Sequence, residues 1–155
     1  MMLGDPHGTV ELGRYGDLFV VRLKGAFNLE GARRLTHEVQ AFWRACGEPR
    51  RWPLLADHRE WEGATPETFA EAANVVHWLE AHGMAAEARV FCGSFMPRVL
   101  DQQKAMKPTS LPAQNFYSID LACDWLERLG FDCGDCREQL AIRTPGLAPA
   151  ALARR

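Results

Sequence analysis

The side chains best suited to chemistry stand at the ends of two short apolar runs. Asp57 and His58 follow the run at residues 52–56, and Cys92 closes the run at residues 88–92. If both runs are neighbouring parallel strands, their carboxyl ends meet at one edge of a sheet, where His58 could act as the base that activates a Cys92 thiolate. Adjacent residues such as Asp57 and His58 point to opposite sides of a strand, which argues against this site. The interpretation we prefer has Asp57 capping backbone amides, His58 exposed, and Cys92 buried as a small apolar residue.

A second candidate is the Cys-Gly-Asp-Cys sequence at Cys133 and Cys136, which has the spacing of a redox or metal-binding pair. Structural zinc sites need more ligands than this, and no second pair lies at zinc-finger distance. Thioredoxin-like pairs stand between a strand and a helix, whereas this pair follows the last predicted helix. We therefore predict a surface turn built on Gly134, with redox or metal chemistry at the two thiols as the alternative.

Signatures of common cofactors are absent from the sequence. It contains no zinc-protease HEXXH pattern, no Walker-type phosphate loop and no Rossmann glycine fingerprint, so we predict no cofactor and no metal. The net charge of -2 and the lack of long Lys or Arg runs argue against general nucleic-acid binding. No apolar run approaches the roughly 20 residues that span a bilayer, so we expect no integral membrane insertion.

The pattern of apolar residues, caps and glycines predicts alternating strands and helices. Strands are expected at 9–14, 18–24, 52–56, 88–92 and 115–117, and helices at 28–47, 65–83, 97–104 and 118–130. The first two strands form a hairpin around Tyr15 and Gly16. The alternation that follows requires right-handed crossovers, which give a mostly parallel sheet with an antiparallel edge. The predicted fold class is therefore α/β, with four or five strands and about four helices.

A single domain is the natural expectation for 155 residues, of which 47% are hydrophobic. We assign residues 1–140 to it. Residues 141–155 form a C-terminal tail, rich in Ala and Pro, that either moves freely or packs on a partner. The start of the sequence shows no export signal, and five cysteines are an odd number for a disulfide framework. These features predict a cytoplasmic protein with reduced thiols.

Five short motifs follow one another in an order typical of a known group. They are Gly25–Asn28, Leu54–Asp57, Gly63–Glu67, Trp78–Leu79 and Ala122–Leu126. On these motifs the chain resembles bacterial SpoIIAA-like proteins of the STAS type over residues 8–131, in an uncharacterised branch grouped with SEC14-like domains. The resemblance implies a (βα) superhelix, in which helices wind around the sheet.

For anti-sigma antagonists of that family, the resemblance implies a phosphorylated Ser or Thr just after the strand equivalent to Leu54–Asp57. This chain has His-Arg-Glu-Trp at residues 58–61 instead, and Thr65, its first hydroxyl, is placed as the N-cap of the next helix. The resemblance therefore extends to the scaffold and not to a phosphate-controlled switch.

The helix predicted at 65–83 has an inward stripe that includes Phe69 and Leu79. Trp78 falls about 180° from Phe69 on the helical wheel, so we expect it to face away from the sheet together with Val75. Tryptophan is favoured at protein interfaces, and this apolar pair therefore predicts a homodimer contact. The alternative for Trp78 is a rim position that a loop covers.

Our leading hypothesis is a non-enzymatic cytoplasmic STAS-like module that binds or regulates a protein partner. Asp57, His58, Arg59 and Trp61 would form a polar turn that, with the following helix, is presented to this partner. The alternative is a carrier of a small apolar ligand or lipid, as the SEC14-like grouping implies, which requires an enclosed apolar pocket. A cysteine-dependent enzyme at Cys92 and His58 is the third hypothesis.

Overall fold

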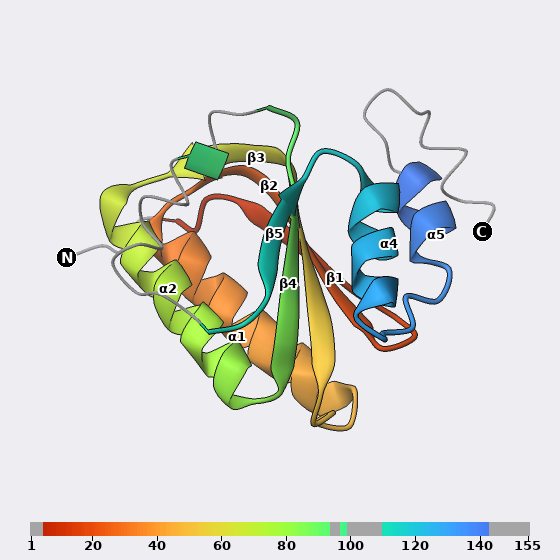
Figure 1. Ribbon diagram of the computed structural model, residues 1–155. Helices are drawn as coiled ribbons and strands as arrows, with labels where there is room; N and C mark the ends of the chain where they lie inside the picture. The colour runs from red at the N-terminus through yellow and green to blue at the C-terminus, as the bar shows by residue number, and fades with distance from the viewer. Residues whose placement is uncertain (1–4, 94–96, 99–109, 143–155) are drawn as a thin grey trace.

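The computed structural model describes residues 5–93, 97–98 and 110–142 of the chain (Figure 1). The described strands are β1 (Thr9–Tyr15), β2 (Leu18–Phe27), β3 (Trp52–Ala64), β4 (Met84–Val90) and β5 (Ala113–Phe116). The described helices are α1 (Leu29–Ala45), α2 (Pro66–Ala81), α4 (Ile119–Arg128) and α5 (Cys136–Ile142). The strands form one sheet in the order β1-β2-β3-β4-β5, in which β1 is antiparallel to β2 and the other neighbours are parallel. The predicted α/β class and the N-terminal hairpin are confirmed.

Helices cover both faces of the sheet, with α1 and α2 on one side and α4 and α5 on the other (Figure 1). Successive residues of a strand face opposite sides, so the central strands supply two separate cores. Val21 and Leu54 pack in the core under α1 and α2. Val20 and Leu55 pack in the core under α4 and α5. Strands β3 and β4 are thus covered on both faces, and the charged side chains that they bury need partners inside the protein.

Strand β3 is longer than the sequence predicts. The expected polar turn at residues 57–61 is absent, because β3 continues to Ala64. In the parallel register with β2, Arg22 lies opposite Asp57. The polar segment therefore continues to pair with β2, through a register shift between Arg22 and Lys24, and the prediction of a turn there is wrong.

Strand β4 begins and ends earlier than predicted, spanning Met84–Val90 in place of residues 88–92. Its charged residues Glu87 and Arg89 alternate with small apolar residues, which pack under α4. Cys92 consequently lies beyond the strand rather than closing it.

Helix α5 is not predicted by the sequence patterns. It begins at Cys136, in the segment expected to form a surface turn, and it crosses the predicted domain boundary at residue 140. Arg137 of α5 forms an ion pair with Asp124 of α4, which ties the two helices together. The rest of the predicted tail, and the helix predicted at 97–104 except for residues 97–98, lie outside the described residues.

Asn28 joins the start of α1 to the segment that precedes β1. Its Oδ1 accepts hydrogen bonds from the N–H groups of Gly31, at 2.8 Å, and His7, at 2.9 Å, and its Nδ2 donates to the carbonyl of Asp5.

We predict that Asn28→Ala lowers the free energy of unfolding by about 1–2 kcal/mol, because it removes a helix cap and two longer-range hydrogen bonds. Chemical denaturation measures this. Ser118→Ala is the matched control, since the Ser118 hydroxyl accepts one N–H, from Leu121 at 3.4 Å. An Asn28 effect no larger than the Ser118 effect would contradict the prediction.

Candidate functional site

Asp57 lies at the centre of a network of charges between β2 and β3. Its carboxylate accepts hydrogen bonds from Arg22 Nε at 3.1 Å and from Arg59 Nε and Nη2, both at 2.9 Å. Arg22 also pairs with Glu11 and Glu60, each at 3.2 Å. Asp57 is only 2% exposed. The predicted role of Asp57 as a cap is confirmed in part, because its Oδ1 also accepts the backbone N–H of Arg59.

The electrostatics of this network keep Asp57 charged. Burial by itself would raise the pKa of Asp57, but the hydrogen bonds and charge of Arg59, together with the charge of Arg22, outweigh it and lower the pKa below its usual value. A carboxylate held in this way is stabilised by internal partners. Arg59 is in turn only 13% exposed in its side chain. Both residues were predicted to face a partner, and the structure places them mainly inside the protein.

His58 is buried in an aromatic environment. Its ring stacks on Phe91 with centroids 4.7 Å apart and meets Trp61 edge-on at 5.4 Å. Its Nδ1 lies 3.1 Å from the carbonyl of Ala56, which can only accept, so Nδ1 carries the proton. Burial lowers the pKa of His58 to about 4, which leaves the imidazole neutral at pH 7. The preferred expectation that His58 is exposed is therefore wrong, and Trp61, also buried, shares its environment.

Cys92 is exposed, so the expectation that it is buried as a small apolar residue is wrong. Its Sγ donates to the carbonyl of Arg59 at 3.3 Å. Among the contacts of the described residues, none joins Cys92 to His58. The geometry therefore does not favour the cysteine-dependent enzyme, since the nucleophile and its base are not brought together.

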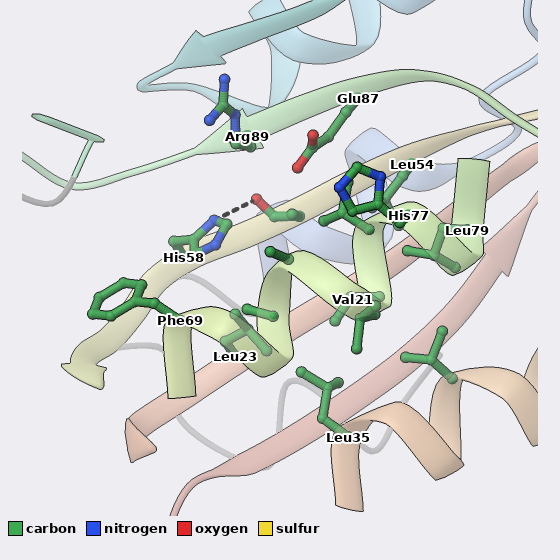
Figure 2. A pocket seen from close by; sticks show the side chains of 16 residues that line it. Val21, Leu23, Leu35, Leu54, His58, Phe69, His77, Leu79, Glu87 and Arg89 are labelled. Atoms are coloured by element: carbon green, nitrogen blue, oxygen red, sulfur yellow. Dashed lines mark hydrogen bonds between the residues drawn. The ribbon is translucent and has the colours of Figure 1, made fainter. Parts of the chain in front are cut away.

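A cavity of about 160 Å³ lies between the sheet and helices α1 and α2. Its walls are mainly apolar and include Val21, Leu35, Leu54, Ala73 and Val76. His58, Glu87 and Arg89 supply polar groups at the side formed by β3 and β4 (Figure 2). Glu87 and Arg89 are 6% and 5% exposed. This cavity combines an apolar body with a few buried polar groups, which is the usual composition of a small-molecule site.

Glu87 and Arg89 are the site residues that sequence reasoning missed. Glu87 and Arg89 are two residues apart in β4, so both side chains lie on the face of that strand that borders the cavity. The signal in the sequence was the alternation of charged with small apolar residues from Ala86 to Val90. That pattern is typical of a strand with one solvated face. Glu87 and Arg89 are buried because the tertiary fold places α1 and α2 over this face of the sheet.

Cys133 and Cys136 do not lie at the surface, as the predicted turn required. Both thiols are buried in the core under α4, beside Cys123. A hydrogen bond with Cys123 and burial raise the pKa of Cys133. For Cys123, the hydrogen bond with Cys133 lowers the pKa, but the hydrogen bond with Cys136 and burial raise it by more, to about 12. Within the described residues, no cluster of three or more His, Cys, Asp or Glu is arranged to hold a metal ion.

We predicted that Val75 and Trp78 of α2 both face away from the sheet, and the structure does not fully confirm this for either residue. Val75 is 8% exposed and packs in the core, so its predicted orientation is wrong. The buried positions of α2 are Thr68, Val75 and Leu79, and Phe69 still faces inward, where it lines the cavity between α2 and the sheet. Trp78 is half-buried by its own chain, stacked on His82 at 3.9 Å and edge-on to Trp43 at 5.4 Å. The homodimer stays a prediction, without the exposed apolar pair that suggested it.

The arrangement of strands and helices matches known structures. The solved structure of an uncharacterized DUF3478-family protein with a SpoIIAA-like fold, from Shewanella loihica PV-4, aligns with a TM-score of 0.58 at 15% sequence identity, over 81% of this chain and 98% of that one. This chain has a SpoIIAA-like fold. An anti-sigma factor antagonist from Mycobacterium paratuberculosis aligns with a TM-score of 0.55 at 17% identity, over 81% of this chain and 99% of that one.

These similarities confirm, at the level of the fold, the resemblance seen in the sequence motifs. At such low identity they describe the scaffold of the SpoIIAA-like chain and not its activity. No protein-family model matches the sequence, and no curated protein does so either. In the part of the chain that the structure describes, no helix is both long enough and apolar enough to cross a bilayer.

We predict that His58 makes stability depend on pH in the range just below neutrality. The unfolded imidazole titrates near 6.5 and the folded one near 4, so the unfolded chain binds a proton first as the pH falls. The stability present above pH 6.5 is thus lost progressively down to pH 4, by about 3 kcal/mol at most. His58→Phe, which can keep the stacking on Phe91, should flatten the profile of unfolding free energy between these limits. The exposed His37→Phe is the control, and equal profiles for both variants would contradict the assignment.

We predict that thiol reagents distinguish the cysteines of the native protein. Cys92 is exposed, Cys46 is half-buried, and Cys123, Cys133 and Cys136 are buried. Cys92 should therefore be labelled fastest at native pH, Cys46 more slowly, and the three buried thiols only after unfolding. Mass spectrometry of the labelled peptides identifies the sites, and Cys92→Ser should remove the fast phase. Native labelling of Cys133 or Cys136 at the rate of Cys92 would instead support redox or metal chemistry at that pair.

Proposed function

We propose that the protein is a non-enzymatic cytoplasmic binding module that acts through contact with another protein, and that the contact lies at the start of α4. The observation that carries this proposal is a pair of large apolar side chains in water. Tyr117 is 60% exposed and Leu121 is 57% exposed. Large apolar side chains gathered at the surface typically mark interaction sites.

The surroundings of this pair extend the surface along one helix and one strand. Leu121, Trp125 and Leu129 recur at a spacing of four residues, so they lie along one side of α4. Trp125 packs on Phe116 of β5, with ring centroids 5.6 Å apart. In the described sheet β5 is an edge strand, and an edge strand offers backbone hydrogen-bonding groups to an added chain. We call this surface, made of Tyr117, Leu121, Leu129 and β5, the α4 surface.

The partner site first predicted at Asp57, His58, Arg59 and Trp61 has less support. Asp57, His58 and Trp61 are buried and Arg59 is nearly so, which leaves a partner little of them to touch. The fold of the anti-sigma factor antagonist supports the proposal only in a general way, since its name describes an action involving another protein.

The test places a photo-crosslinking amino acid at position 121 of the full chain and, as a control, at position 41, an exposed alanine of α1. The proposal predicts that one discrete protein crosslinks from position 121 and not from position 41, and that added wild-type protein competes whereas Leu121→Glu does not. If the captured protein is a second copy of this chain, the contact is the homodimer expected from the sequence. The same pattern of products from both positions would overturn the proposal.

A second candidate function, the binding of a small apolar molecule, is favoured by one specific observation. The cavity under α1 and α2 has mainly apolar walls and room for a ligand, but it is partly open to solvent, whereas the carrier hypothesis predicts an enclosed pocket. The cavity and the α4 surface lie on opposite faces of the sheet, so one chain can carry both functions (Figure 1).

A further inference from the structure

The size of the cavity limits what it can hold. A dry engineered cavity of about 150 Å³ in another protein binds benzene, so about 160 Å³ accommodates one ring or a similar group of atoms. A lipid acyl chain is several times larger than this. The carrier hypothesis, which named a small apolar ligand or a lipid, therefore narrows to a small molecule whose ring-sized part fills the cavity.

The wall chemistry requires most of the ligand to be apolar. Most of the side chains from β2, β3, α1 and α2 are aliphatic, with Val21, Leu54, Leu35 and Val76 among them, and the exceptions are His58, Phe69 and His77. Ala72 and Ala73 of α2 also line the cavity, and their small size is what leaves the space open. An apolar ligand gains free energy here by leaving water for a preformed space.

The polar side of the cavity offers hydrogen-bond acceptors. Figure 2 shows the Glu87 side chain leaving β4 towards α2, while the Arg89 guanidinium is directed away from the apolar side chains. A carboxylate has about four acceptor positions, so Glu87 can accept a hydrogen bond from a ligand in addition to its contacts within the protein. His58 uses Nδ1–H on Ala56, which leaves Nε2 as an acceptor.

We propose that the cavity binds a neutral, ring-sized molecule bearing a hydroxyl group, such as a phenol, whose O–H donates to Glu87. This inference rests on the second candidate function and names its ligand class. Glu87 and Arg89 carry opposite charges and stand two residues apart on β4, so they offset each other and a ligand charge of either sign would enter the buried site uncompensated. A hydroxyl group can donate to Glu87, in addition to the contacts that Glu87 makes within the protein, without adding a charge to a buried site.

The test is an NMR titration of the isotope-labelled full chain with four probes of similar size: phenol, benzene, benzoate and benzylammonium. We expect phenol to shift the amide signals of the residues that line the cavity. Its affinity should exceed that of benzene severalfold and that of either ion by about tenfold or more, as expected for one buried hydrogen bond and one uncompensated charge.

Two matched variants on α2 locate the site. Ala73→Leu fills the cavity and should abolish phenol binding, whereas Ala70→Leu makes the same change at an exposed position and should leave it intact. Glu87→Met keeps the length of the side chain and removes its acceptors, so phenol and benzene should then bind equally. If Glu87→Met does not fold, the two alanine variants and the four probes still decide the question.

The outcomes separate this inference from the function beneath it. Equal binding of phenol and benzene, lost in Ala73→Leu, would support a ligand-binding function and overturn the hydroxyl preference. A preference for benzoate or benzylammonium would overturn the inference as well. Binding that survives Ala73→Leu would show that the site lies elsewhere, and no binding of any probe at millimolar concentration would overturn both the inference and the ligand-binding function.

Discussion

The structure depends on one constraint: charges carried by central strands must be neutralised inside the protein. Arg22 and Asp57 face each other across β2 and β3 and are almost completely buried. A buried ion pair contributes little net stability, but losing one partner leaves the other charge uncompensated, which is strongly destabilising. Asp57 therefore requires β3 to remain paired with β2 at Arg22, and the pairing continues beyond this point through two register shifts. The length of β3 and the burial of the segment once expected to be a turn follow from this requirement.

The two faces of the sheet solve the packing problem differently. Under α4 and α5, small and medium apolar side chains from β3 and β4 fill the space together with three thiols. Under α1 and α2, β4 presents Glu87 and Arg89, and α2 presents Ala72 and Ala73. Charged side chains cannot interdigitate with an aliphatic core as methyl groups do, and alanines do not reach far enough to close the gap. The cavity is the consequence of that combination.

Three of the residues that the sequence suggested as reactive are held in environments that make them unreactive. His58 is neutral between aromatic rings, Cys133 is a core thiol with a raised pKa, and Asp57 is engaged by two arginines. The features left available to other molecules are an apolar cavity on one face and the α4 surface on the other. A scaffold of this kind can couple the two, because β3 and β4 contribute side chains to both faces.

The sequence alone determined the order of strands and helices, the N-terminal hairpin and the caps at Asn28 and Ser118, because periodicity and capping are local properties of the chain. It also carried enough motif order to indicate the SpoIIAA-like scaffold. The tertiary structure decided the extent of β3, the burial of Val75 in α2, the existence of α5 and the burial of Glu87 and Cys133. Each of these depends on what lies opposite: Arg22 for β3, the strands beneath α2, and Asp124 for α5. A local sequence pattern does not specify which polar residues will contact a residue from a distant segment. The cavity is formed by such long-range contacts.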